Sequence, residues 1–152
     1  MSGDRMIVKI EQDLSVKEIE ILIKYPAMNK DVERIAAMLQ SVNTRIRCRL
    51  AGSEKFVSAS DIYYFESVEK TTFVYCEKEV YETDYRLYEV VKELMHPGFI
   101  QISKSCVLNI DVLDSVAPLL NSRMEATLQN GERLLVTRKY LENLKQALRQ
   151  RV

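Results

Sequence analysis

The sequence predicts an α+β protein made of several short strands and a few helices. Apolar and polar residues alternate over short stretches, which is typical of half-buried strands. The dipeptide Asn130-Gly131 separates two such stretches, as expected for a β-hairpin. Two further stretches, one ahead of Pro97-Gly98 and one near the C-terminus, carry apolar residues at helical spacing. With 152 residues and 47% hydrophobic content, the chain can bury one sizeable core.

Residues 1–50 are expected to form a small strand-strand-helix-strand segment. Strands are expected at residues 6–10 and 18–25, and in the second of these every other residue from 19 to 23 is isoleucine. Pro26 should end that strand, and Asn29 can cap a helix that runs to about Val42. Alternation resumes at residues 45–50. We expect this segment either to extend the sheet of the remaining chain or to mediate self-association.

Residues 51–152 are expected to form the main domain. A helix is predicted at about residues 84–95, ended by Pro97-Gly98, and a strand follows with Ile100, Ile102 and Cys106 on one face. The Asn130-Gly131 turn predicts paired strands at about 123–129 and 132–136. A last helix shows an apolar stripe that fits a core and could also serve a dimer. That stripe consists of Tyr140, Leu141, Leu144 and Leu148.

Several short motifs follow one another in a characteristic order. They are Asp61-Ile62-Tyr63-Tyr64-Phe65-Glu66, the helix with Leu87 and Leu94, Phe99-Ile100-Gln101-Ile102-Ser103-Lys104-Ser105, Val107-Leu108-Asn109, Asn130-Gly131 and Val136-Thr137-Arg138-Lys139-Tyr140. Over about residues 58–148, the chain in this respect resembles the LytTR family of bacterial DNA-binding domains. The resemblance implies a mostly antiparallel β fold that inserts loops, and no recognition helix, into successive major grooves of DNA.

The resemblance also implies which residues contact DNA. Three loop positions contact base edges in that family, and Asn109 and Arg138 fall on two of them with the expected residue types. The third position lies in the loop at 67–72, where Lys70 and Thr72 are candidates. The expected DNA-binding set is completed by Ser103, Lys104 and Lys139, of which the two lysines would contact phosphates.

The function expected from this resemblance is sequence-specific binding of duplex DNA by a transcriptional regulator. We expect a homodimer, and family resemblance also implies a small membrane protein as a regulator. A receiver domain of about 120 residues does not fit into the first fifty, so direct control by phosphoryl transfer is not expected. An RNA-binding module is one alternative, because Tyr63, Tyr64, Tyr75 and Tyr81 could stack on bases. A ligand-binding or protein-interaction module that keeps the fold is the other.

Charge distinguishes these alternatives only weakly. The net charge is +0, which argues against a broadly basic surface for nucleic acids. The charge is uneven along the chain, however. Residues 1–50 carry 9 basic and 7 acidic side chains, residues 51–98 carry 5 and 10, and residues 99–152 carry 8 and 5. The segment with most of the expected contact residues is therefore the most basic. The row Arg45, Arg47 and Arg49 is expected to be a solvated strand face, with a phosphate-contacting edge as the alternative.

Enzymatic and metal-binding functions are not expected. Cys48, Cys76 and Cys106 are too widely spaced for a zinc motif, and the single histidine, His96, is expected to cap a helix end. No glycine-rich phosphate loop is present among the 4 glycines. We therefore expect no cofactor and no metal. The absence of a signal-peptide pattern and of a long apolar run predicts a protein of the reducing cytoplasm.

Overall fold

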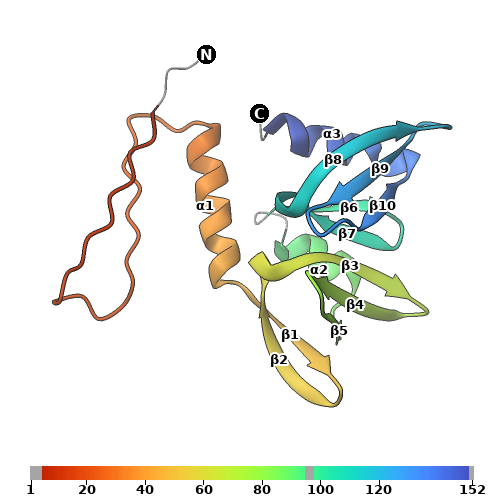
Figure 1. Ribbon diagram of the computed structural model, residues 1–152, viewed down its shortest axis with the longest axis horizontal. Coiled ribbons are helices and arrows are strands. Elements are labelled where there is room, and N and C mark those ends of the chain that lie inside the picture. The colour runs from red at the N-terminus through yellow and green to blue at the C-terminus, as the bar shows by residue number, and fades with distance from the viewer. Residues whose placement is uncertain (1–4, 95–97, 151–152) are drawn as a thin grey trace.

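Two antiparallel sheets and three helices make up the part of the chain that the structure describes, residues 5–94 and 98–150. We describe a computed structural model of the protein (Figure 1). The larger sheet has seven strands in the order β2-β1-β5-β4-β3-β7-β6, and the smaller has three in the order β10-β9-β8. This arrangement confirms the α+β class and the mostly antiparallel fold.

The bounds of the elements are as follows. The larger sheet contains β1 (Arg45–Leu50), β2 (Ser53–Ser58), β3 (Ile62–Val68), β4 (Thr71–Cys76), β5 (Val80–Thr83), β6 (Phe99–Ser103) and β7 (Cys106–Asn109). The smaller sheet contains β8 (Leu113–Leu119), β9 (Arg123–Leu128) and β10 (Arg133–Val136). The α-helices are α1 (Lys30–Asn43), α2 (Leu87–Leu94) and α3 (Leu141–Gln150), and the 3-10 helices are η1 (Ala59–Asp61), η2 (Ile110–Val112) and η3 (Arg138–Tyr140).

Two clusters of buried side chains hold these elements together. In the first, Val90 and Leu94 of α2 pack against the larger sheet, where Phe65 and Phe99 meet edge to face with ring centroids 5.7 Å apart. The second cluster joins both sheets to α3, whose Leu144 is fully buried. Leu141 and Leu148 pack partly buried against this cluster, so the apolar stripe of the last helix faces the core.

A polar contact inside the second cluster also links the two sheets. Tyr64 of β3 is buried, stacks on Tyr75 of β4 at 4.3 Å between ring centroids, and donates a hydrogen bond of 2.6 Å to the Glu132 carboxylate. Glu132 lies at the start of the return strand of the β9–β10 hairpin. Burial, and then the neighbouring Glu132 carboxylate, raise the pKa of Tyr64, so its hydroxyl keeps its proton, and with it this bond, to a higher pH than an exposed tyrosine would.

The two strands expected at residues 6–10 and 18–25 are absent. Residues 5–29 form an extended, exposed arm without helix or strand, which lies on the far side of α1 from the sheets (Figure 1). Apolar and polar residues do alternate in this arm, but a two-stranded ribbon is only marginally stable in water unless its apolar face is covered. The helix after the arm is confirmed, and the Asn29 side chain accepts the Val32 N–H at 3.0 Å.

The sheet also crosses the expected boundary at residue 50. β1 pairs with β2 along its whole length, from Arg45 opposite Ser58 to Leu50 opposite Ser53. The last strand of the N-terminal segment thus extends the larger sheet, which is one of the two roles expected for that segment.

The β9–β10 hairpin forms as predicted, but its turn differs. The strands pair with Arg133 opposite Thr127 and Val136 opposite Met124. Leu128 donates its N–H to the Glu132 carbonyl at 2.8 Å, so three residues and not two lie in the loop. In that loop Gly131 has a φ of 90°, whereas Asn130 is not in the left-handed region. A three-residue hairpin loop needs a left-handed residue at its last position only, which the glycine supplies.

The Tyr64–Glu132 contact should contribute measurably to stability. We expect Tyr64→Phe to lower the free energy of unfolding by about 1.5–3 kcal/mol at neutral pH, because a buried hydrogen bond to a carboxylate is lost. Urea unfolding measures the loss. Tyr75→Phe is the matched control, since its hydroxyl lies 3.4 Å from Glu66 and should contribute less.

The pH dependence of the same variant tests the raised pKa. A tyrosine with a raised pKa in the folded state contributes its full stability below its ordinary pKa of about 10 and loses it as the pH rises further. The stability gap between the wild type and Tyr64→Phe should therefore narrow above about pH 10. A gap that stays constant to pH 11, or a variant as stable as the wild type, would contradict this account.

Candidate nucleic-acid interface

Three loops from different parts of the sequence meet at one end of the molecule. They are the β3–β4 turn at residues 69–70, the β6–β7 turn at residues 104–105, and η3 after β10. Ser67 donates its N–H to the Ser105 carbonyl at 2.9 Å, and Thr137 donates its N–H to the Ile102 carbonyl at 3.0 Å. The β6–β7 hairpin thus holds the other two loops, and we call the three together the loop cluster. Both hairpin turns point away from α1 and the arm (Figure 1).

The β3–β4 turn presents Lys70 to solvent. Glu69 and Lys70 are its two central residues, and both have left-handed backbone, with φ of 49° and 69°. This is the two-residue turn whose twist suits an antiparallel pair. Thr72 lies one pair inside the turn, where it is 3% exposed, so its side chain belongs to the sheet and not to the loop surface.

The β6–β7 turn and η3 present the remaining cations. Lys104 is exposed, and its carbonyl accepts a bond of 3.4 Å from the Gln101 amide. The neighbouring Ser103 side chain accepts the Ser105 N–H at 3.3 Å, which shapes the turn. Arg138 and Lys139 are exposed in η3, directly before α3. Because Leu144 buries α3 in the core, the base of η3 is fixed while its cationic tips stay in solvent.

The cations of the loop cluster have no acidic partners. Among residues 5–94 and 98–150, no ion pair involves Lys70, Lys104, Arg138 or Lys139. Lys139 instead lies with its ammonium 5.6 Å from the ring centroid of Tyr140, a cation–π arrangement. These exposed cations are therefore available to an anionic ligand without first breaking an ion pair.

The arginine row of β1 shows the opposite arrangement. Arg47 bonds to Glu54 through Nε at 3.1 Å, and Arg49 contacts Asp84 at 2.7 Å and Glu82 at 3.6 Å. These arginines offset neighbouring carboxylates on the strand surface, which is the first of the two roles considered for the row.

Arg86 is a further cation at the loop cluster that sequence reasoning missed. It is exposed, and its guanidinium donates a bond of 3.4 Å to the Lys70 carbonyl. It lies in the connection ahead of α2, and its own N–H donates to the Glu89 carboxylate at 3.0 Å. Arg86 and Lys70 lie 16 residues apart in the sequence and have no motif in common. Only the folded structure therefore shows that they are neighbours.

Asn109 lies at the other end of β7 from the loop cluster. It is 2% exposed, its Nδ2 donates to the Ile62 carbonyl at 2.9 Å, and its Oδ1 accepts the Asp111 N–H at 3.0 Å. It caps η2 and ties β7 to the start of β3. A side chain with this burial and these bonds is not available to a base edge, so we take Asn109 out of the expected contact set. Asparagine commonly stabilises turns in this way.

The tyrosines expected to stack on RNA bases are engaged inside the protein. Tyr64 and Tyr75 stack on each other, and Tyr81 donates a bond of 2.9 Å to Glu79. Tyr63 is half-buried and packs against the second core cluster. The geometry gives these rings a role in sheet packing.

Comparison with known proteins agrees with this arrangement. The family model described as the LytTr DNA-binding domain matches residues 53–149. The chain belongs to this family. All three loops of the cluster, Arg86 and Asn109 fall inside the matched range, whereas the arm, α1 and β1 precede it.

Proteins similar to this LytTR member include three described as sensory transduction protein LytT. The one from Enterococcus faecalis is 26% identical over 60% of this chain and 38% of its own length. The one from Bacillus anthracis is 29% identical over 61% of this chain and 38% of its own. The one from Bacillus subtilis is 23% identical over 85% of this chain and 54% of its own. The chain therefore spans only about a third to a half of these relatives.

A solved LytTr DNA-binding domain from Bacillus cereus shares the fold. Its TM-score is 0.66 at 24% identity, and the match covers 69% of this chain and 96% of that one. No helix in the described part of this LytTR chain is long and apolar enough to cross a membrane. Within the same residues, no group of three or more His, Cys, Asp and Glu side chains could hold a metal ion. His96 lies outside the described residues.

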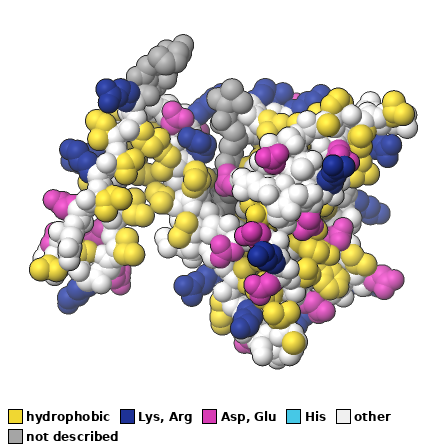
Figure 2. Space-filling view, in the orientation of Figure 1, with side chains coloured by type: hydrophobic (Ala, Val, Ile, Leu, Met, Phe, Trp, Pro, Cys, Tyr) yellow, Lys and Arg dark blue, Asp and Glu magenta, His cyan; other side chains and the backbone are white. Residues whose placement is uncertain are grey.

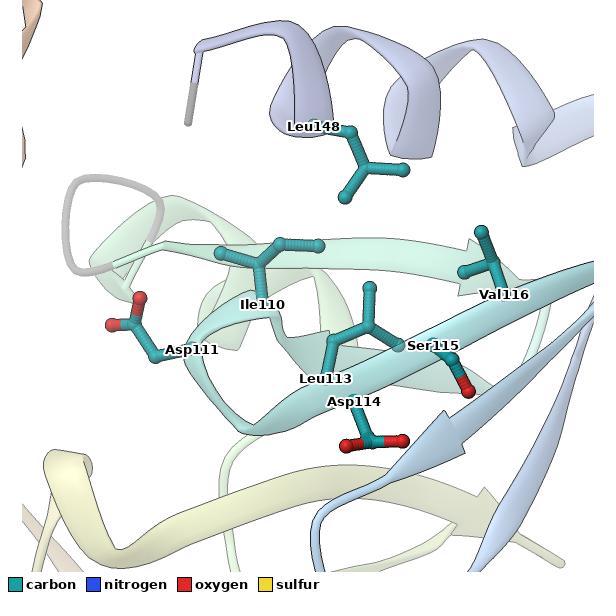
Figure 3. Close-up of a pocket in the computed structure, with 7 residues that line it drawn as sticks. All are labelled: Ile110, Asp111, Leu113, Asp114, Ser115, Val116 and Leu148. Carbon is teal, nitrogen blue, oxygen red and sulfur yellow. The ribbon is translucent and has the colours of Figure 1, made fainter. Parts of the chain in front are cut away.

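The LytTR domain also has a shallow hollow between α3, η2 and β8, shown in Figure 3. Leu148 of α3 faces Ile110, Leu113 and Val116 across it, while Asp114 points away from Leu148 (Figure 3). Asp111 and Asp114 give its rim a negative charge. This hollow follows directly on Asn109, at the far end of β7 from the β6–β7 turn, so it is separate from the loop cluster.

The structural role of Asn109 leads to a prediction about stability. Asn109→Ala should lower the free energy of unfolding by about 2–4 kcal/mol, because it leaves a buried carbonyl and an N–H without their partners. Lys104→Ala, on the exposed turn at the other end of the same hairpin, should change it by less than about 0.5 kcal/mol. Urea unfolding of both variants measures the difference, and an Asn109→Ala variant as stable as the wild type would disprove the role.

Proposed function

We propose that the chain binds duplex DNA in a sequence-specific manner through the loop cluster and acts as a transcriptional regulator. The observation that carries the proposal is the convergence of three loops whose exposed cations form no ion pair within residues 5–94 and 98–150. Loops held at fixed spacing by backbone hydrogen bonds can enter neighbouring grooves without first becoming ordered. Membership of a DNA-binding domain family supports the same function.

Different residues of the cluster would have different roles. Arg138 carries a planar fork of donors that fits O6 and N7 of guanine, so we assign it to base reading. Lys70, Arg86, Lys104 and Lys139 would contact phosphates, which position the protein but carry no sequence information. Ser103 would support the β6–β7 turn, with its hydroxyl already bonded to the Ser105 N–H.

We also propose that the protein acts as a homodimer in the cytoplasm, bound to a direct or inverted repeat. One loop cluster covers a short site, and two copies would double the length of sequence that is read. A small membrane protein that restrains the dimer is the regulator that family resemblance suggests.

A ligand-binding or protein-interaction module remains the second candidate, favoured by the net charge of +0. A gel shift on duplex DNA at several salt concentrations separates the two functions. Specific DNA binding requires a complex that weakens with salt, whereas an interaction module forms none.

Arg138 should determine specificity. The specific site is first obtained by selecting bound sequences from a random duplex pool. Arg138→Ala should then weaken binding to that site by about 1–3 kcal/mol while changing the affinity for random duplex DNA little. Arg133→Ala is the matched control, because Arg133 is also exposed, on β10, but already contacts Glu125 at 3.9 Å. Equal losses on both duplexes would reduce Arg138 to a generic phosphate contact.

The phosphate contacts should be visible in the salt dependence. With roughly three to six phosphates neutralised per subunit, log affinity should fall against log salt with a slope of about −3 to −5. Lys104→Ala and Arg86→Ala should each reduce this slope by about 1, since each removes one contact. Lys55→Ala, an exposed lysine on the edge strand β2, should leave it unchanged. A slope near zero, or an equal effect of Lys55→Ala, would argue against the proposed interface.

A further inference from the structure

The arm exposes an unusual amount of aliphatic surface. Ile10 is 96% exposed, Ile19 94%, Ile7 75%, Val8 74% and Ile21 64%. Figure 2 shows hydrophobic side chains gathered along the arm and α1. Large aliphatic side chains gathered on one exposed segment mark an interaction surface, because water disfavours a contiguous apolar patch.

The arm already contains the turn of a hairpin. Val16 donates its N–H to the Asp13 carbonyl at 3.2 Å, and the Asp13 carboxylate accepts from the N–H and the hydroxyl of Ser15 at 2.9 and 2.7 Å. The chain reverses direction here, and the two halves of the arm run back side by side as an open loop (Figure 1). No backbone ladder joins these halves within the described residues.

The turn fixes the register that a ladder would have. Continuing from the Asp13–Val16 pair, Ile10 lies opposite Ile19, Val8 opposite Ile21 and Met6 opposite Ile23. Side chains of alternate pairs share one face of a hairpin, so all six aliphatic residues would lie together. The other face would carry Arg5, Ile7, Lys9, Glu11, Glu18, Glu20, Leu22 and Lys24. The next pair on the aliphatic face is Gln12 opposite Lys17, so this face carries a single charge beside the turn, while the other face is largely charged.

We propose that residues 5–24 close into this hairpin by packing its aliphatic face against the same face of a second copy of the chain. Apart from Lys17 beside the turn, the face has no charge, so two copies can bring their aliphatic residues together without placing like charges between them. A charged partner would find no ion among these aliphatic residues to pair with. In an isolated hairpin nothing covers the aliphatic face. This explains why the two halves of the arm form no backbone ladder in a single chain.

The area of this face is close to what a specific dimer needs. Complete burial of one aliphatic side chain removes on the order of 80 Å² from water, so the six, of which Ile23 is already half-buried, bury less than about 500 Å² per subunit and less than about 1,000 Å² in the pair. The aliphatic face alone therefore approaches the lower bound for a specific interface. Further area would come from Met38 and Val42 of α1, which are 45% and 59% exposed.

The location of the arm favours a second copy over the chain's own domain. α1 has 14 residues and is therefore about 21 Å long, and it separates the arm from the sheets (Figure 1). The arm lies on the opposite side of the molecule from the two hairpin turns of the loop cluster. A dimer joined through the arms would leave both loop clusters free, so this inference supplies the surface for the homodimer proposed above.

The test compares two neighbouring substitutions in the full-length chain. Ile21→Glu places a charge on the aliphatic face, whereas Leu22→Glu places the same charge on the opposite face, and both positions are exposed in the single chain at 64% and 77%. Sedimentation equilibrium without DNA, at about 1 to 100 µM, should show dimers for the wild type and Leu22→Glu. Ile21→Glu should be monomeric, with a dissociation constant raised at least 100-fold.

A second measurement shows whether the hairpin forms. Amide hydrogen exchange at residues 6–10 and 19–23 should slow as the wild-type concentration rises, and should stay fast in Ile21→Glu. A wild type that is monomeric at 100 µM would overturn the proposal, as would two variants with equal effect. A monomeric wild type whose thermal stability falls in Ile21→Glu would show that the arm packs on its own domain instead.

DNA binding is measured separately on the same proteins. Ile21→Glu should keep its affinity for a single half-site, because the loop cluster is unchanged, and should lose the added affinity for the repeat. If none of the proteins binds DNA while the wild type still dimerises, the proposed function fails and the dimer surface stands.

Discussion

The position of every loop in the candidate interface depends on the β6–β7 hairpin. On one side β7 pairs with β3, and Ser67 bonds to Ser105 at the tip. On the other side Thr137 bonds to Ile102, which fixes η3 and, through it, the start of α3. All four residues of β7 are buried, and β6 contributes the buried Phe99 and Ile102. Spacing between the loops is therefore set by backbone hydrogen bonds in a packed core, and side-chain contacts at the surface contribute little to it.

Because the net charge of the chain is +0, its electrostatic attraction for a ligand depends on how the charged side chains are distributed over the surface. Arginines on β1, β10 and α3 are matched by nearby carboxylates, as in the Arg49–Asp84 and Arg149–Glu142 pairs. The cations of the loop cluster are left unmatched. The loop cluster thus brings several exposed cations close together in a protein with no net charge, and such a local excess can attract an anion there.

Apolar spacing in the sequence was enough to predict individual elements, whereas the exposure of polar residues was not predictable from it. Apolar spacing identified α2, α3 and the face containing Ile102 and Cys106, because burial of a stripe is a local property of one element. Asn109 and Thr72 are expected at the surface but are buried. Their exposure could not be predicted, because the exposure of a polar residue near a strand end depends on what packs over it. The sequence does not reveal that Arg86 lies at the loop cluster, because its neighbour Lys70 belongs to a different loop. In the arm, alternation predicted strands at residues 6–10 and 18–25 that do not form, because a two-stranded ribbon needs a surface to cover its apolar face.

The left-handed backbone at Glu69 and Lys70 has a consequence for engineering. Side chains other than glycine in this conformation are disfavoured by about 1–2 kcal/mol each, and glycine at either position would relieve that strain. A selection of variants for heat resistance alone would therefore enrich glycine at residue 70, and would remove a cation from the loop cluster at the same time. A thermostabilised version of this domain must therefore keep Lys70, because the glycine that would raise the melting temperature would also remove its charge.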